Sequence, residues 1–245
     1  MRRSRRSTGR AASTARTSAG ARWNPVTDES LPLEPPSHYR DRAERLADLI
    51  VHLTGLALAL VGGGMLLGLA IGFGDAGSLT AAAIYAVGLL TMLGLSTAYN
   101  FAAARYQPLL RRFDHAGIFL MIAGSYTPFT TQHLTGAWAW GMTSAVWGIA
   151  VFAALAKLFL PGLGKGFWIV VYLALGWLMV IAIQPILKSL GLAPLILMAI
   201  GGVLYSVGVV FYANKAMRFR RAIWHGHVVV AAAVHWAAVL LAVLK

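Results

Sequence analysis

The chain has 245 residues, of which 58% are hydrophobic and only 12% charged. Its apolar residues form several runs of about 20 residues, long enough to cross a bilayer, which excludes a soluble globular domain. The net charge of +13 is then best explained by membrane topology and headgroup contacts. Membrane lipids are the expected partners, and no nucleic-acid partner is expected. Because there is no cysteine, disulfides, thiolate metal ligands and a cysteine nucleophile are excluded.

Residues 1–39 differ in composition from everything that follows. Seven arginines lie among Ser, Thr, Ala and Gly between Met1 and Trp23, with no acid, and a proline-rich piece comes next. This pattern predicts a disordered basic tail weakly attracted to anionic lipid. Organellar targeting is the alternative, and the tail lacks the apolar core of a secretory signal. We therefore predict a tail over 1–39 and a membrane domain over 40–245.

The membrane domain is predicted to be all-α, a bundle of seven transmembrane helices. Each segment is long enough to span the hydrocarbon core, and glycine, proline or aspartate marks the breaks between segments. The fifth is expected to end at Gln184-Pro185, before an apolar connection that reaches Pro194. The predicted spans are 46–73, 79–101, 114–132, 136–159, 166–184, 193–213 and 223–244.

The distribution of basic residues predicts the orientation. In a seven-span chain, 19 of the 21 lysines and arginines fall on one side, and only Lys188 and Lys245 fall on the other. Cytoplasmic loops carry the excess of positive residues. We therefore predict a multi-pass protein of the plasma (cytoplasmic) membrane, with the N-terminus in the cytoplasm and the C-terminus outside.

Four helix ends are predicted to bring polar side chains to one depth near the cytoplasmic face. An ionised carboxylate inside a membrane costs roughly 3 kcal/mol or more, so such groups usually face the bundle interior and one another. The expected polar cluster comprises Glu44, Asp48 and His52 from the first helix, Ser96 and Asn100 from the second, Asp114 from the mouth of the third, and Arg221 and His225 from the seventh.

These residues carry a resemblance to a known family. The run from Arg111 to Phe129, the segment 222–225 with His235 ten residues later, and the Glu44, Asp48, His52 series are similar to the hemolysin III family. That family is grouped with the progestin and adipoQ receptors and the alkaline ceramidases. The resemblance covers roughly residues 41–245 and implies seven helices with a zinc site near the cytoplasmic face.

The implied metal site consists of three histidines with an Asp-associated water. They are supplied by Ser-x3-His on the second helix, Asp on the third and His-x3-His on the seventh. The chain keeps Ser96, Asp114 and His225 at matching positions, but it has Asn100 and Arg221 where the resemblance expects histidine. An amide is a poor zinc ligand, and a permanent cation opposes a divalent ion. Asp114 and His225 thus remain as candidate metal ligands, with Ser96 and Asp114 as candidate catalytic groups.

Three interpretations of Arg221 stay open. Arg221 can replace the metal as the counter-ion of Asp114, because a guanidinium forms forked hydrogen bonds with a carboxylate. It can equally snorkel to lipid headgroups. Alternatively, zinc persists with a rearranged ligand set of His225, Asp114 and either His52 or Glu44.

The sequence leaves three classes of function. The favoured one is a non-catalytic relative of hemolysin III that takes part in membrane lipid homeostasis or sensing. The first alternative is a zinc-dependent hydrolase of lipid amide or ester bonds, as the resemblance to ceramidases implies. The second is a cytolytic pore-forming protein, as the family name implies, although a pore needs a continuous polar lining and these polar groups gather at one end.

Overall fold

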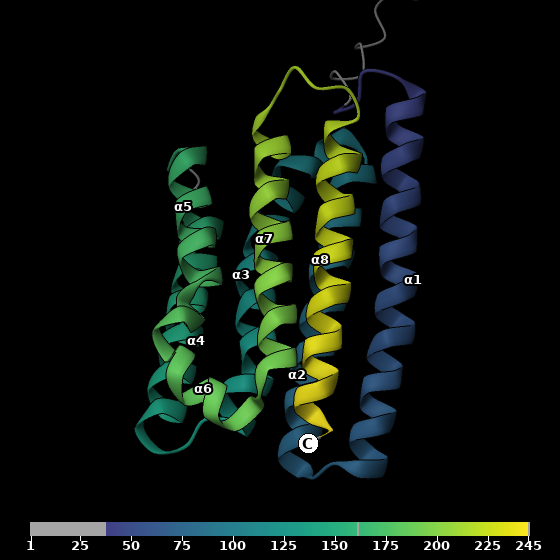
Figure 1. The fold of residues 1–245 in the computed structure, drawn as a ribbon. Coiled ribbons are helices and arrows are strands. Elements are labelled where there is room, and N and C mark those ends of the chain that lie inside the picture. Colours follow the sequence, from purple (N-terminus) through teal and green to yellow (C-terminus); the bar gives the residue numbers. More distant parts are fainter. Residues whose placement is uncertain (1–37, 161, 245) are drawn as a thin grey trace, which may run out of the picture. The chain divides into compact units, whose positions relative to one another are not determined.

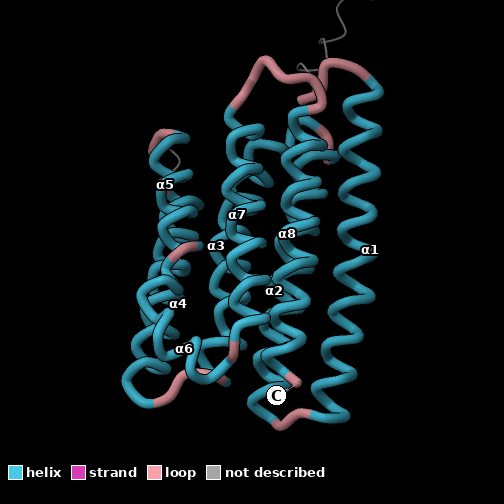
Figure 2. The backbone as a smooth tube through the Cα atoms, viewed as in Figure 1, coloured by secondary structure: helices cyan, strands magenta, loops and turns pink. Residues whose placement is uncertain are grey.

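The computed structural model describes residues 38–160 and 162–244. The predicted tail therefore lies outside the described residues, apart from His38 and Tyr39. Throughout the described part the chain is helical, without a strand, and its loops lie at the helix ends (Figure 2). The elements are α1 (Arg42–Phe73), α2 (Ala76–Phe101), η1 (Ala104–Tyr106), α3 (Gln107–Gln132), α4 (Gly136–Phe159), α5 (Lys165–Gly176), η2 (Leu178–Ala182), α6 (Ile183–Leu190), α7 (Leu192–Ala213) and α8 (Arg220–Val243).

Six helical segments are long and apolar enough to cross a membrane. They are α1, α2, α4, the run 165–190 that joins α5, η2 and α6, and then α7 and α8. The seventh predicted span, α3, is also 26 residues long but is less apolar. Twelve of its residues are buried, and it packs chiefly against α2 and α4. An interior helix faces other helices more than lipid, so it tolerates polar side chains that a lipid-facing helix does not.

The start of α3 corrects one expectation. The helix begins at Gln107 rather than near Asp114, because Pro108 occupies its first turn, where a missing N–H is tolerated. Asp114 consequently lies two turns inside α3 and not at its mouth. This places the carboxylate among the neighbouring helices, where it is 9% exposed.

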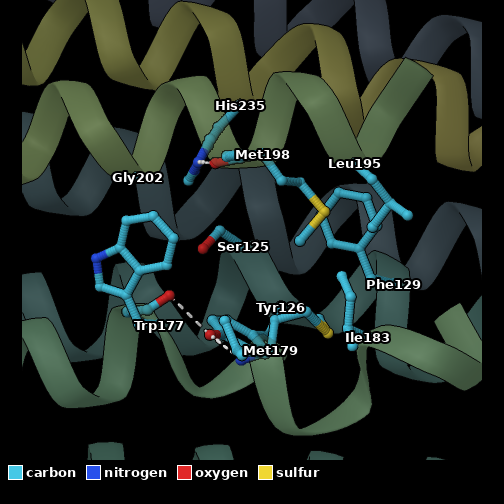
Figure 3. Close-up of a pocket in the computed structure, with 13 residues that line it drawn as sticks. Ser125, Tyr126, Phe129, Trp177, Met179, Ile183, Leu195, Met198, Gly202 and His235 are labelled. Atoms are coloured by element: carbon cyan, nitrogen blue, oxygen red, sulfur yellow. Dashed lines mark hydrogen bonds between the residues drawn. The ribbon is translucent and has the colours of Figure 1, made fainter. Parts of the chain in front are cut away.

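The predicted fifth span is broken, and the break is not at Gln184-Pro185. Pro185 lies in the first turn of α6, where its lack of an N–H costs no helical hydrogen bond. The α-helix ends instead at Gly176, and the short 3-10 helix η2 follows. The Tyr126 hydroxyl lies 2.8 Å from the Gly176 carbonyl and 2.9 Å from the Met179 N–H (Figure 3). It also lies 3.0 Å from the Leu175 carbonyl. A side chain of α3 thus satisfies the backbone groups that the break exposes.

The helices pack so that four of them converge at one end. α1 lies against α2 and α8, and α2 lies against α3, while α4, α5 and α6 stand on the opposite side from α1 (Figure 1). The start of α1, the end of α2, the start of α3 and the start of α8 share the upper end in this view. That end is where the sequence places its buried acids and histidines.

Candidate polar site at one end of the bundle

A backbone clasp joins the start of α1 to the loop before α8. Asp41 caps α1 by accepting the Glu44 N–H at 2.8 Å. Glu44 in turn accepts the N–H of Phe219, at 3.2 Å, and the N–H of Arg40, at 3.1 Å. Phe219 has a φ of 55°, a left-handed conformation that is unusual for a bulky side chain. Glu44 thus holds the strained turn that starts α8, and it is buried for that reason.

Exposed contacts reinforce this clasp. The Arg40 guanidinium donates to the backbone carbonyls of Lys215 and Ala216, at 3.0 and 3.1 Å. Arg218 forms an ion pair with Asp41 at 3.3 Å. Surface pairs of this kind contribute little to stability individually. Together they join the start of α1 to the loop before α8 at the end of the bundle that holds the cluster.

Asp48 lies at the centre of the cluster and is fully buried. Its Oδ1 is 2.6 Å from His225 Nδ1, and its Oδ2 accepts the Tyr39 hydroxyl at 2.6 Å. Burial, followed by the hydrogen bond to Asp48, raises the pKa of Tyr39, so the hydroxyl remains a donor at neutral pH. Both carboxylate oxygens therefore have partners, one from the segment before α1 and one from α8.

His52 lies one turn further along α1 and is 2% exposed. Its Nδ1 is 2.8 Å from the Asp48 backbone carbonyl and 3.6 Å from Asp48 Oδ1. Its Nε2 is 3.4 Å from the Ser96 hydroxyl of α2. The His52 and His225 rings are 4.3 Å apart between centroids, nearly perpendicular to each other. The two imidazoles are therefore neighbours, with the Asp48 carboxylate beside both.

The two side chains at the positions where the resemblance leads us to expect histidine are bonded to each other. Arg221 Nη1 donates to Asn100 Oδ1 at 2.9 Å, and the Asn100 amide donates to the Ser96 carbonyl at 2.9 Å. Arg221 Nε is buried and has no protein partner. Among the described residues Arg221 forms no ion pair with Asp114, so the predicted counter-ion pairing is wrong. Its guanidinium faces the cluster and also lies over the Tyr39 ring, 5.8 Å from the centroid.

Asp114 is the third buried acid of this end of the bundle. Ser96, His225 and Arg221 lie close enough to Asp114 to influence it electrostatically. These contacts bring together the predicted residues of α2, α3 and α8. Glu44, Asp48 and His52 of α1 complete the set, so all eight predicted members lie at this end.

The family-type metal position does not fit zinc in this chain. A structural or catalytic zinc needs three or four nitrogen, sulfur or oxygen ligands. At this position Asn100 and Arg221 use their polar atoms on each other, and the guanidinium offers only donors. Asp114 and His225 remain, which is fewer ligands than zinc requires.

A different group of ligand atoms lies beside that position. Asp48, His52 and His225 each offer a ligand atom, and these atoms all lie within 4.8 Å of one another. Asp48 was predicted to lie on the same helix face as His52 but was not predicted to be a metal ligand. The i, i+4 spacing of the two residues was the available signal. Tyr39 was missed altogether, because it precedes α1 and belongs to no helical pattern.

Two cavities formed by the described residues lie elsewhere. One is a surface depression at the start of α4, lined by Ala137, Trp138, Gly141 and Met142. The other, of about 100 Å³, lies between α3, η2, α7 and α8, behind the broken helix (Figure 3). Ligand pockets usually measure about 300 Å³ or more, so this cavity holds at most a short piece of an acyl chain. No member of the polar cluster lines either cavity.

The fold and the site define a multi-pass helical membrane protein with a buried cluster of carboxylates and histidines at one end of its bundle. Comparison with known proteins identifies the family to which the chain belongs within this class. The haemolysin-III related family matches residues 43–236, and the chain belongs to that family. The Hemolysin-3 homolog of Bacillus subtilis is 34% identical over 206 residues, which cover 82% of this chain and 95% of that relative.

Two further relatives show the breadth of the family. Hemolysin-3 of Bacillus cereus is 31% identical over 202 residues, which cover 82% of this chain and 92% of the relative. The human monocyte to macrophage differentiation factor is 28% identical over 203 residues, which cover 80% and 83% of the two chains. These matches span the membrane domain, and they agree with the resemblance that the motifs indicated.

Proposed function

We propose that this chain is a seven-span, non-hydrolytic member of its family that responds to the lipid around it. The hydrogen bond between Arg221 and Asn100 carries the proposal, because it occupies two of the positions from which the family would bind zinc. The clasp around Glu44 also covers the cluster, and neither cavity reaches it.

The broken segment supports the lipid-responsive part of the proposal. Val180 and Ile181 of η2 are 58% and 64% exposed, so this side of the break faces lipid in a membrane. The cavity of about 100 Å³ lies on the inner side of η2. A short 3-10 helix packed over a cavity has few contacts to hold it, and such regions open at low free energy. Changes in bilayer thickness would act first on this segment.

The proposed topology has α3 as a span and both the N-terminus and the cluster on the cytoplasmic side. Every described lysine and arginine except Lys188 lies at the end of the bundle that holds the cluster, as the positive-inside rule requires of a cytoplasmic end. α3 is about 39 Å long at 1.5 Å per residue, enough for a bilayer. This orientation fits the plasma membrane location expected from the sequence.

Because the chain has no cysteine, single Ala→Cys variants test the topology directly. An impermeant maleimide should label Ala76→Cys and Ala137→Cys in intact cells. Ala103→Cys and Ala216→Cys should react only after the membrane is permeabilised. All four positions are exposed at helix ends. Labelling of Ala103→Cys and Ala137→Cys from the same side would show that α3 does not span.

Reconstituted protein tests the functional proposal. In vesicles of phosphatidylcholine with ceramide, we expect no release of fatty acid above that of protein-free vesicles, with or without added zinc. Hydrogen exchange in η2 should quicken or slow when the acyl chains of the phosphatidylcholine are shortened from 18 to 14 carbons, while exchange in α2 stays the same. Equal exchange in both bilayers would overturn the lipid-responsive part.

One observation favours the alternative of a metal-dependent hydrolase with an altered ligand set. Asp48, His52 and His225 present three ligand atoms, and Asp114 and Ser96 lie next to them. Three protein ligands with an open position are typical of catalytic zinc. Zinc-dependent release of fatty acid that disappears in His52→Gln would establish this function and contradict ours. A cytolytic pore has less support, since the buried acids and histidines of the described helices gather at one end.

A further inference from the structure

We propose that Asp48, His52 and His225 form a binding site for a divalent metal ion, with zinc as the ion that this ligand set favours. α1 supplies the first two residues one turn apart, and α8 supplies the third. The ligand atoms lie within 4.8 Å of one another. Two histidines and one carboxylate make a set that zinc proteins use.

The measured separations suit a small metal ion. Ligand atoms held about 2.0–2.2 Å from a tetrahedral ion lie roughly 3.3–3.6 Å apart. Asp48 Oδ1 is 3.6 Å from His52 Nδ1 and 2.6 Å from His225 Nδ1. To bind an ion between them, His225 Nδ1 has to move roughly 1 Å away from Asp48 Oδ1. This ring is the most accessible of the three, at 12% exposure, whereas Asp48 and His52 are 0% and 2% exposed.

Neighbouring groups hold the candidate ligands in place. The Tyr39 hydroxyl binds Asp48 Oδ2, which leaves Oδ1 toward the two rings. The Ser96 hydroxyl lies against His52 Nε2, so His52 Nδ1 is the nitrogen that would bind the ion, in exchange for its present contact with the Asp48 carbonyl. Partners of this kind orient metal ligands in known sites, and their loss typically weakens metal affinity 10- to 100-fold.

The buried carboxylates also favour a cation. Glu44, Asp48 and Asp114 are buried at this end, and the guanidinium groups of Arg221 and Arg111 are close enough for their charges to act on Asp114. Ionised carboxylates inside a bundle are costly unless cations lie beside them.

The proposed site differs from the family-type site that the resemblance implies. Only His225 is common to both, and the other two ligands come from α1 instead of the Asn100 position of α2 and the Arg221 position of α8. Asn100 and Arg221, which disable the family-type position, contribute no ligand to the new one. Metal binding here is independent of the lipid-responsive function proposed above, because that function does not require an ion.

Zinc and cobalt binding to the full chain in detergent test the inference. After removal of bound metal with a chelator, loading with zinc and dialysis against metal-free buffer, we expect the unmodified protein to retain about one zinc per chain by elemental analysis. Cobalt should give a visible absorption spectrum that zinc abolishes. His52→Gln and His225→Gln should each lower zinc affinity at least ten-fold, since each removes one of three ligands.

His227→Gln is the matched control. His227 lies two residues from His225 on the same helix, and its Nδ1 lies against the Ile223 carbonyl at 2.8 Å, so its replacement should leave affinity unchanged. A protein that binds neither zinc nor cobalt would overturn the proposal, and the cluster would then be a hydrogen-bonded network alone. Zinc binding that survives both His52→Gln and His225→Gln would overturn it as well. The cobalt spectrum of the unmodified protein decides the matter even if a variant fails to fold.

Discussion

Replacement of Asp48 with asparagine should lower the free energy of unfolding by about 3 kcal/mol. The carboxylate is fully buried and joins Tyr39 to His225 through two contacts of 2.6 Å. An amide keeps the shape but loses the charge, and it presents an NH₂ group to one of the two partners. Removal of one member of a buried charged network costs more than the network contributes, because the remaining polar groups stay buried.

Reversible unfolding in mixtures of dodecyl maltoside and sodium dodecyl sulfate, followed by circular dichroism, measures this change. Asp75→Asn is the matched control at the other end of the bundle. Asp75 is exposed and caps α2 by accepting the Ser78 N–H at 2.7 Å, and asparagine caps helices as well as aspartate does. Equal stability of Asp48→Asn and the control would show that the centre of the cluster contributes nothing to the fold.

Replacement of Tyr126 with phenylalanine is the second change with a large expected effect, a loss of about 2–4 kcal/mol. The ring stays, but the Met179 N–H loses its acceptor and the carbonyls of Leu175 and Gly176 lose their donor. All three backbone groups belong to the break between α5 and η2. Each polar group left buried without a partner costs about 1–3 kcal/mol.

The same unfolding assay measures this effect, and hydrogen exchange adds the location. In Tyr126→Phe, the amides of η2 should exchange faster than those of α2 and α3. Tyr106→Phe is the control, since Tyr106 is half exposed at the start of α3. Unchanged exchange in η2 would mean that the tyrosine does not hold the broken helix.

The helical class and the approximate spans were predictable from the sequence. A long apolar run in a bilayer has to satisfy its backbone hydrogen bonds internally, and it does so as an α-helix. α4 follows its predicted bounds of 136–159, and α7 begins one residue before the predicted position. α3 was harder. Its first two turns contain Arg111, Arg112 and Pro108, which hydropathy assigns to a loop, yet they belong to the helix, and Arg112 donates to the Leu158 carbonyl of α4.

The broken fifth span could not be predicted. In a sequence, a proline usually indicates a helix break. Pro185, however, lies in the first turn of α6, where it does not interrupt the helix. The actual break at Trp177 depends on the Tyr126 hydroxyl, fifty residues away. The local sequence pattern around a helix break does not indicate a hydrogen-bond partner that another helix supplies.

The members of the cluster were predictable, and their pairing was not. Helical spacing placed Glu44, Asp48 and His52 on one face of α1, and in the structure Asp48 and His52 lie beside His225. Pairing of Arg221 with Asp114 was one of three open interpretations, and it rested on the forked hydrogen bonds that a guanidinium forms with a carboxylate. In the structure its guanidinium reaches Asn100, because the choice between an amide and a carboxylate depends on how α2 and α8 approach each other.

The zinc content of the variant Asn100→His, Arg221→His, made in a His52→Gln background, tests the central claim most directly. That claim is that the Asn100–Arg221 contact displaced the family-type metal position. We predict that His52→Gln alone retains almost no zinc, and that the triple variant regains about one zinc per chain through the restored histidines and His225. Zinc bound equally by His52→Gln and the triple variant, or by neither, would contradict the account.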